Sequence, residues 1–324
     1  SKEHLTMTEA FIISILVITI RAGTSLLYAT FGAIITERSG IQNLGVEGIM
    51  IVGAAASFAA AYHGDSVWLG LGTAILVGFI LGLIHAILTI TLRAEQVVSG
   101  LAMTIFGGGL ASFMGQRLGP NNSTMVGLQG PSFERIPIPV LSEIPYIGES
   151  FFNQDILVYI LYITIPLLWF YFYKTRQGLE LRAVGENPQA IDALGMNVTR
   201  LRFIYTIVGA IFMAVAGAHL SLGYLQGWAD NITGGRGWIA IALVIFSTWS
   251  PLRAVLGALL FGGINALQFR LQAAGTTLPS SFLNMLPYLA TILVLIVITW
   301  TEKHNKRLGT PTSLGIPFVR EEKK

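Results

Sequence analysis

The residues of this sequence that could do chemistry are few, because the spacing of its reactive side chains fits no common catalytic or metal site. The five histidines are far apart and lack the spacing of metal ligands, so we expect no metal ion. The chain has no Cys, which excludes thiolate ligands, cysteine nucleophiles and disulfides. It also lacks the GxxxxGK[ST] motif that cradles the phosphates of ATP. We therefore predict a chain that is not an enzyme and binds no cofactor of its own.

Polar residues near apolar segments are the candidates for a binding role. Glu47 is an acid close to the start of such a segment, and the others are mainly amides. Amides suit a neutral solute that is recognised by hydrogen bonds, whereas a coupled ion would need acids or unwound, oxygen-rich backbone. Asn265 and Gln268 are three residues apart, so they share one face of a helix. We predict that a substrate path is lined by Asn43, Glu47, Trp238, Asn265 and Gln268.

Three titratable residues fall inside long apolar runs, namely Arg21, His85 and His219. For Arg21 we expect a side chain that snorkels to the membrane interface, and the alternative is that it faces a polar cavity. For the two histidines we expect hydrogen-bonded packing positions, and the alternative is a proton relay. The apolar runs contain no paired carboxylates, which a proton-driven pump would be expected to carry.

A polar interval at 174–202 separates two charge-free apolar segments and contains an amphipathic pattern. Asn187-Pro188 is typical of a helix start, with proline at the first helical position. Gly195 can end that helix in a left-handed conformation. The interval contains five Lys and Arg residues, and short basic loops stay on the cytoplasmic side of a membrane. We predict a short helix at the inner membrane face.

The amino-acid composition indicates what kind of protein holds these residues in place. Of its 324 residues, 53% are hydrophobic and 11% are charged, which is less than half the charge of a typical soluble domain, about 25%. An all-α, multi-pass membrane protein fits these values. The net charge of +3 comes from loops between spans, so it indicates orientation and not nucleic-acid binding. The first apolar run leads straight into further apolar segments, so we expect no signal peptide.

About nine transmembrane helices are predicted from the apolar runs; most are near the ~20 residues that cross a bilayer, and the run at 237–249 is shorter. We expect one transmembrane domain over 1–324. Its first half covers 10–173 and includes an external, proline-rich loop at 117–155. The loop at 174–202, the second half at 203–300 and a cytoplasmic tail at 301–324 follow. The spans are predicted at 10–35, 48–64, 67–92, 97–116, 156–173, 203–222, 237–249, 254–269 and 282–300.

Two glycine-bearing polar segments, 43–48 and 231–237, each end in a charged residue plus glycine and lead into an apolar helix. In the predicted topology one starts from the inner side and the other from the outer side. Such a pair indicates an inverted repeat whose broken helices line a central path. Backbone exposed at membrane depth is tolerated only where protein or water satisfies it, so both segments should approach that path.

Four strings carry a resemblance to a known family: ERSGIQNLGVEGIMIVGA (37–54), LRAEQVVSG (92–100), GLELRAVGENPQAIDALGMNV (178–198) and the 235–272 segment that begins GRGWIAIALVIFSTWSPLRAV. They resemble permease subunits of bacterial ABC importers, in the family of nucleoside, ribose, simple-sugar and branched-chain amino acid permeases. The resemblance covers 37–300, and RAVGENPQAIDALG is its most specific piece. It implies import of a small neutral solute, and the nucleoside-type permeases are the subgroup it favours.

The resemblance also implies an architecture, a set of partners and a coupling site. The fold would be like that of cobalamin-type importer permeases, with two inverted halves and a first span missing here. The partners would be a cytoplasmic ABC ATPase that holds ATP and Mg, a second permease subunit, an extracytoplasmic solute-binding lipoprotein, and membrane lipid. The chain would lie in the bacterial cytoplasmic membrane, with its C-terminus on the cytoplasmic side. The spacing Gln189-Ala190-x4-Gly195 is similar to the EAA-x3-G loop of importer permeases, with Gln for Glu. Residues implied to couple to the ATPase are Arg182, Glu186, Asn187, Pro188, Gln189, Asp192 and Gly195.

Two alternatives stay open from the sequence. The same machinery could carry a ribose-like sugar or another neutral solute, because aromatic rings stack on a sugar as well as on a base. A chain of another class, a stand-alone ion-coupled transporter, would move its solute without an ATPase. The scarcity of acids inside the apolar runs argues against this second alternative.

Overall fold

The computed structural model describes residues 7–145, 147–273 and 309–319, together with scattered positions between 279 and 300. The described chain is mostly helical, as predicted. Seven of its helices are long and apolar enough to cross a membrane, and an eighth apolar helix, α10, is shorter. The ninth predicted span, 282–300, lies largely outside the described residues. The seven long helices are α1 (Met7–Arg38), α2 (Val46–Gly64), α3 (Val67–Ala86), α4 (Gln96–Arg117), α6 (Ile156–Lys174), α9 (Val198–Ala218) and α11 (Pro251–Ala273).

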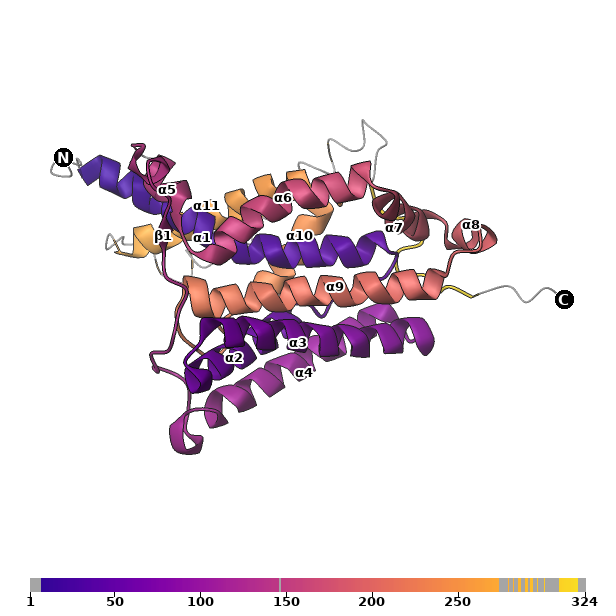
Figure 1. The fold of residues 1–324 in the computed structure, drawn as a ribbon, viewed down its shortest axis with the longest axis horizontal. Helices are drawn as coiled ribbons and strands as arrows, with labels where there is room; N and C mark the ends of the chain where they lie inside the picture. The colour runs from indigo at the N-terminus through magenta and orange to yellow at the C-terminus, as the bar shows by residue number, and fades with distance from the viewer. Residues whose placement is uncertain are drawn as a thin grey trace.

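Helix α1 lies at the centre of the bundle and packs against α9 on one side and α11 on the other (Figure 1). Helix α9 in turn packs against α2 and α3. Small residues permit this close approach: a Cβ added at Gly32 of α1 would collide with the carbonyl oxygen of Gly209 of α9. In a membrane, helices associate through such backbone contacts because lipid offers no hydrophobic driving force between them.

The two ends of the bundle carry different structures (Figure 1). At one end, the predicted 117–155 loop forms short helices and a two-stranded sheet. These elements are η2 (Pro120–Asn122), β1 (Ile136–Pro137), η3 (Leu141–Glu143), α5 (Ile147–Phe152) and β2 (Asn153–Gln154). At the other end lie α7 (Arg176–Glu186) and α8 (Pro188–Ala193), together with the 309–319 segment. We call these the α5 end and the α7–α8 end.

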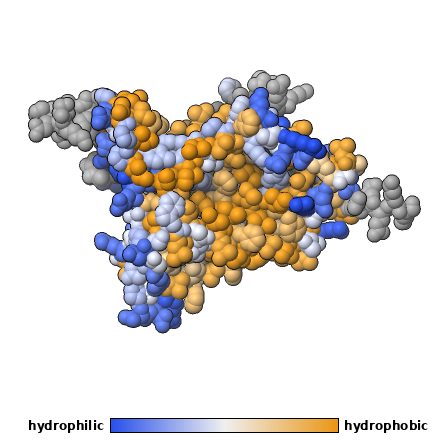
Figure 2. Space-filling model, viewed as in Figure 1, coloured by the Kyte–Doolittle hydropathy of each residue, from blue (hydrophilic) through white to orange (hydrophobic). Residues whose placement is uncertain are grey.

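The surface between the two ends is hydrophobic in the view of Figure 2, whereas polar residues gather at the ends. Large apolar side chains point outward from the helices in between: Ile105 and Phe113 of α4 are 79% and 62% exposed, and Ile163 of α6 is 60% exposed. A belt of this kind is what a lipid-facing surface requires.

Several helix boundaries differ from the predicted spans. Helix α2 begins at Val46, inside the polar segment predicted at 43–48 and before the charge-free run that starts at Gly48. Two spans end in π-helical turns, η1 (Ile87–Thr91) after α3 and η4 (His219–Tyr224) after α9. The helix expected at 237–249 is α10 (Arg236–Phe246), which follows a non-helical segment from Leu225 to Gly235.

Candidate functional site

Glu47 joins the two polar breaks inside the bundle. Its Oε1 accepts hydrogen bonds from the backbone N–H of Gly235, at 2.9 Å, and from the hydroxyl of Thr233, at 2.5 Å. Its Oε2 accepts one from the N–H of Gly237, at 2.6 Å. The Glu47 side chain is 8% exposed, and a Cβ at Gly237 would collide with its backbone. The segments 43–48 and 231–237 are therefore in direct contact.

This contact gives the α10 N-terminus a carboxylate from α2. The first N–H groups of any helix lack partners inside the helix and carry a partial positive charge. Gly235 and Gly237 stand at the start of α10, so Glu47 satisfies two of these groups and neutralises the local charge. A helix N-terminus facing a cavity would otherwise attract an anion. The occupied N-terminus is therefore better matched to a neutral solute than to an anionic one.

The other predicted path residues lie on neighbouring elements. Asn43 is 1% exposed, and its Oδ1 accepts from the N–H of Gly45 at 2.8 Å while its amide nitrogen has no partner within the described chain. Trp238 follows the Glu47 contact on α10 and is 40% exposed. Asn265 and Gln268 are both buried on α11, which packs against α1 and α10. The structure thus brings Glu47 and the start of α10 together, and the assignment of all five residues to a path stays a prediction.

The local signals in the 174–202 loop predicted α8 correctly. The Asn187 side chain caps this helix by accepting from the N–H of Ala190 at 3.0 Å, and Pro188 takes the first position. Gly195 adopts the expected left-handed backbone, with φ of +81°. Of the residues assigned to coupling, four are exposed (Glu186, Asn187, Gln189 and Gly195), Arg182 and Asp192 are half-buried, and Pro188 is buried. Leu194, which the sequence analysis did not assign, is 75% exposed at the tip.

Helix α7 was not predicted, and it is the element that anchors α8 to the bundle. Thr175 caps it by accepting from the N–H of Gly178 at 3.0 Å. Its residues Leu181 and Val184 are fully buried, so one face of α7 packs against the membrane helices. Arg182 lies over the ring of Tyr173, with its guanidinium carbon 5.1 Å from the ring centre. The loop is consequently a pair of packed helices, with α8 at its exposed tip.

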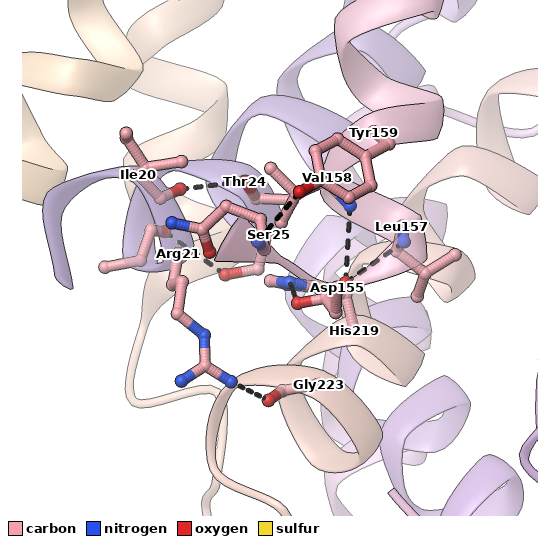
Figure 3. A network of polar contacts seen from close by, with 12 residues as sticks. Ile20, Arg21, Thr24, Ser25, Asp155, Leu157, Val158, Tyr159, His219 and Gly223 are labelled. Carbon is pink, nitrogen blue, oxygen red and sulfur yellow. Dashed lines mark hydrogen bonds and ion pairs between the residues drawn. The ribbon is translucent and has the colours of Figure 1, made fainter. Parts of the chain in front are cut away.

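A buried polar cluster at the α5 end escaped the sequence analysis (Figure 3). Asp155 and His219 have fully buried side chains, and Oδ2 of Asp155 lies 3.5 Å from Nε2 of His219. Asp155 also caps α6, because its Oδ1 accepts from the N–H of Leu157 at 3.0 Å. Burial opposes ionisation of Asp155, yet His219, the backbone N–H groups and Arg21 together hold the pKa of its carboxyl below the ordinary value. The cluster thus holds a charged carboxylate inside the protein.

This cluster bears on one expectation from the sequence. Arg21 is half-buried and donates to the carbonyl of Gly223 in η4, so within the bundle its guanidinium has a protein partner. Asp155, the last residue of the predicted 117–155 loop, is a buried helix cap. The available sequence signal was an Asp directly before an apolar run, which is a common N-cap position. His85 does behave as a packing residue, with Ser99 Oγ at 3.0 Å and the Gln42 carbonyl at 3.1 Å.

The apolar helical bundle, the internal polar breaks and the exposed helical loop together define an integral membrane protein of the permease class. The chain matches the model of the family described as branched-chain amino acid transport system / permease component over residues 14–300, and it belongs to that family. It is therefore a transport subunit of an ABC importer and not an enzyme. Hydrolysis of ATP takes place on a separate subunit of such systems.

Curated relatives cover nearly the full chain. A permease of Haloferax volcanii provisionally assigned to glucose, TsgC13, is 37% identical, over 96% of this chain and 99% of its own length. The nucleoside ABC transporter permease protein NupC of Lactococcus lactis is 36% identical, over 92% and 94%. The guanosine ABC transporter permease protein NupQ of Bacillus subtilis is 32% identical, over 91% and 93%. A solved structure titled as an inward-facing metal-chelate type ABC transporter aligns with 90% of this chain and 85% of its own, at 14% identity and a TM-score of 0.48.

Proposed function

We propose that this permease imports nucleosides. Two of the relatives named above carry nucleosides or guanosine and match more than nine-tenths of this chain. The observation that carries the proposal is the Glu47 contact, which leaves no unpaired helix N-terminus at the start of α10 for an anion. A neutral solute with several hydrogen-bonding groups fits such a path, and Trp238 beside it offers a ring on which a base can stack.

A simple sugar is the second candidate, and one observation favours it. The relative with 37% identity is provisionally assigned to glucose. A sugar shares the neutral charge and the hydrogen-bonding groups of a nucleoside, but it lacks the flat base. Stacking on Trp238 therefore separates the two candidates.

The α7–α8 pair is proposed as the coupling site for the ATPase, with the α7–α8 end on the cytoplasmic side. The support is its arrangement: α8 projects from the bundle, while α7 is packed against α1, α6 and α9. A push on α8 would therefore reach three helices of the bundle through a rigid element. The C-terminus would lie on the same side, because the 309–319 segment is at this end. A second permease subunit and an extracytoplasmic binding lipoprotein complete the proposed importer, with ATP and Mg on the ATPase.

An inverted repeat is proposed to underlie the bundle, with about nine spans if the 282–300 segment crosses. Its halves would equate α1 with α9 and α3 with α11. The packing is consistent with this relation, because the pair α1–α11 and the pair α9–α3 are both extensive, and α1 packs against α9. In each half a polar break then leads into the next helix, α2 or α10.

The test is uptake by the assembled importer in proteoliposomes, with labelled guanosine and labelled glucose offered separately. We expect ATP-dependent uptake of the nucleoside and little of the sugar, and Trp238→Leu should reduce nucleoside uptake more than it reduces sugar uptake. Uptake of glucose alone would overturn the nucleoside assignment. Uptake without any ATPase would overturn the transporter class itself.

A further inference from the structure

The 309–319 segment makes a set of contacts that the proposed function does not use. It runs across the α7–α8 end and bonds first to α7. The backbone N–H of Ser313 donates to the Gly185 carbonyl at 2.9 Å, and its hydroxyl donates to the same carbonyl at 2.6 Å. One residue further back, the Thr312 hydroxyl donates to Oε2 of Glu186 at 2.7 Å. The segment is therefore tied to the last turn of α7, directly before α8.

The same segment is tied to the end of α1. The N–H of Gly315 donates to the Gly40 carbonyl at 3.2 Å, and Arg38 donates to the Gly309 carbonyl at 3.3 Å. Arg38 also donates to the carbonyl of Trp249, at 3.2 Å, in the turn between α10 and α11. The indole N–H of Trp249 returns to α1 by donating to Glu37 at 2.6 Å. Arg38 thus connects the segment with the end of α10.

Arg202 adds the start of α9 to this junction. It is 1% exposed, and it donates to the Ile316 carbonyl at 3.1 Å and to the Ser313 hydroxyl at 3.2 Å. The Ser313 hydroxyl consequently bridges two helices, since it accepts from Arg202 of α9 and donates to Gly185 of α7. Burying a guanidinium against neutral groups is costly unless it is hydrogen-bonded. Arg202 gains these two bonds only while the segment stays in place.

We propose that the 309–319 segment is the mechanical link that carries movement of α7–α8 to α1 and to the end of α10. Ser313 and Arg202 are positioning residues in this link. The inference rests on the proposed coupling role of α8. α7 also packs directly against α1, α6 and α9, and Gly185 lies against the carbonyl of Arg38. Beyond this packing, the segment joins α7, α9, α1 and, through Arg38, the α10–α11 turn by hydrogen bonds. Through Glu47, α10 is joined to α2 and to the predicted path.

The first experiment measures solute imported per ATP hydrolysed by the complete importer. In Ser313→Ala the bridge between α7 and α9 is lost with little change in volume, and we expect a roughly three- to tenfold lower ratio, since each neutral hydrogen bond contributes on this order. Hydrolysis stimulated by the loaded binding protein should stay within about twofold of its normal rate. Thr312→Val should lower the ratio less, because Thr312 is exposed, and Thr312→Ser, which keeps the hydroxyl, should restore it. A normal ratio in both Ser313→Ala and Thr312→Val would overturn the proposal.

The second experiment separates the link from the coupling role. The chain has no native Cys, so single spin labels can be placed at Leu194 of α8 and at Ile245 of α10, both of which are exposed. We expect both labels to respond to ATP in the otherwise unchanged importer. With Ser313→Ala added, the label on α8 should still respond, and the response of the label on α10 should be lost.

A label on α10 that responds normally in Ser313→Ala would show that movement reaches α10 by another route, and the proposal would then be wrong. A label on α8 that is silent in the unchanged importer would instead overturn the coupling role of α8. The thermal stability of Ser313→Ala, measured in the same detergent, should stay within a few degrees of the parent. A merely structural role would instead lower the stability and leave the amount of solute imported per ATP unchanged.

Discussion

The two ends of the bundle compensate their buried charges in different ways. At the α5 end, the carboxylate of Asp155 lies 3.5 Å from His219 and near Arg21, which carries the opposite charge. At the α7–α8 end, Arg38 and Arg202 donate to backbone carbonyls and a hydroxyl, and in the described part of the chain these acceptors are neutral. One end is thus held by opposite charges and the other by exchangeable hydrogen bonds.

The difference has a consequence for movement. Removing one partner of a buried ion pair leaves an uncompensated charge, which costs about 3–5 kcal/mol. Exchanging one neutral acceptor for another, or for water, changes the free energy by only about 0.5–1.5 kcal/mol per bond. The α5 end should therefore remain fixed while the α7–α8 end rearranges. A subunit that is driven from one side requires such a difference between its two ends.

Asp155→Asn should have the largest effect. The amide can still cap α6, but Arg21 loses the opposite charge near it and His219 loses its carboxylate neighbour, so we expect a loss of about 3 kcal/mol in stability or failure to accumulate in the membrane. Thermal unfolding in detergent measures this loss. Asp65→Asn is the matched control, because Asp65 is exposed and its left-handed backbone, with φ of 47°, suits asparagine. An Asp155→Asn protein as stable as the parent would break the contrast between the two ends.

Glu47→Gln tests the contact that lies between the two ends. A carboxylate accepts three hydrogen bonds there, whereas an amide presents an N–H₂ group to one of the donors at the start of α10. We expect solute uptake to fall by roughly tenfold or more, since hydrogen bonds to a charged group contribute about 1.5–3 kcal/mol each. Glu95→Gln is the control: Glu95 also accepts from a helix N–H, that of Val98, but it is exposed. Equal effects in the two variants would show that burial of Glu47 is unimportant.

The sequence predicted those parts of the site that depend on neighbours in the chain. Asn187, Pro188 and Gly195 set the limits of α8 within a few residues of one another, and their signals were sufficient. The bridges made by Ser313 and by Asp155 were missed, because each joins residues more than sixty positions apart that only the packed bundle brings together. Helix α7 was missed because most of its sequence is polar or glycine, and only Leu181 and Val184 among its buried residues are large and apolar.

Leu194→Asp tests the exposed tip of the α7–α8 end. An apolar side chain that is 75% exposed contributes little to the fold, so thermal stability should change by less than about 0.5 kcal/mol. If α8 docks against an ATPase, a charge at this position should weaken copurification of that subunit by roughly tenfold, the cost of burying an unpaired charge in an interface being at least this large. Leu179→Asp is the control, because Leu179 is 58% exposed on α7 and away from the tip. Undiminished copurification would place the docking surface elsewhere.

Asn265→Leu should have the smallest effect, and it tests whether the path only passes the solute or also selects it. Asn265 is 9% exposed on α11, so leucine of similar volume fits while the amide group is lost. If the path only passes a solute that a binding protein has already selected, the uptake rate should fall by about two- to fivefold, the worth of one neutral hydrogen bond. The preference for guanosine over other nucleosides should then stay within about twofold in competition assays. Gln268→Leu, one turn further along the same face, should behave alike, whereas Leu256→Ala, at a side chain that is 67% exposed, should leave both quantities unchanged. A change in preference larger than the change in rate would show that α11 selects the solute. Specificity would then be set in the middle of the bundle and not at its two ends.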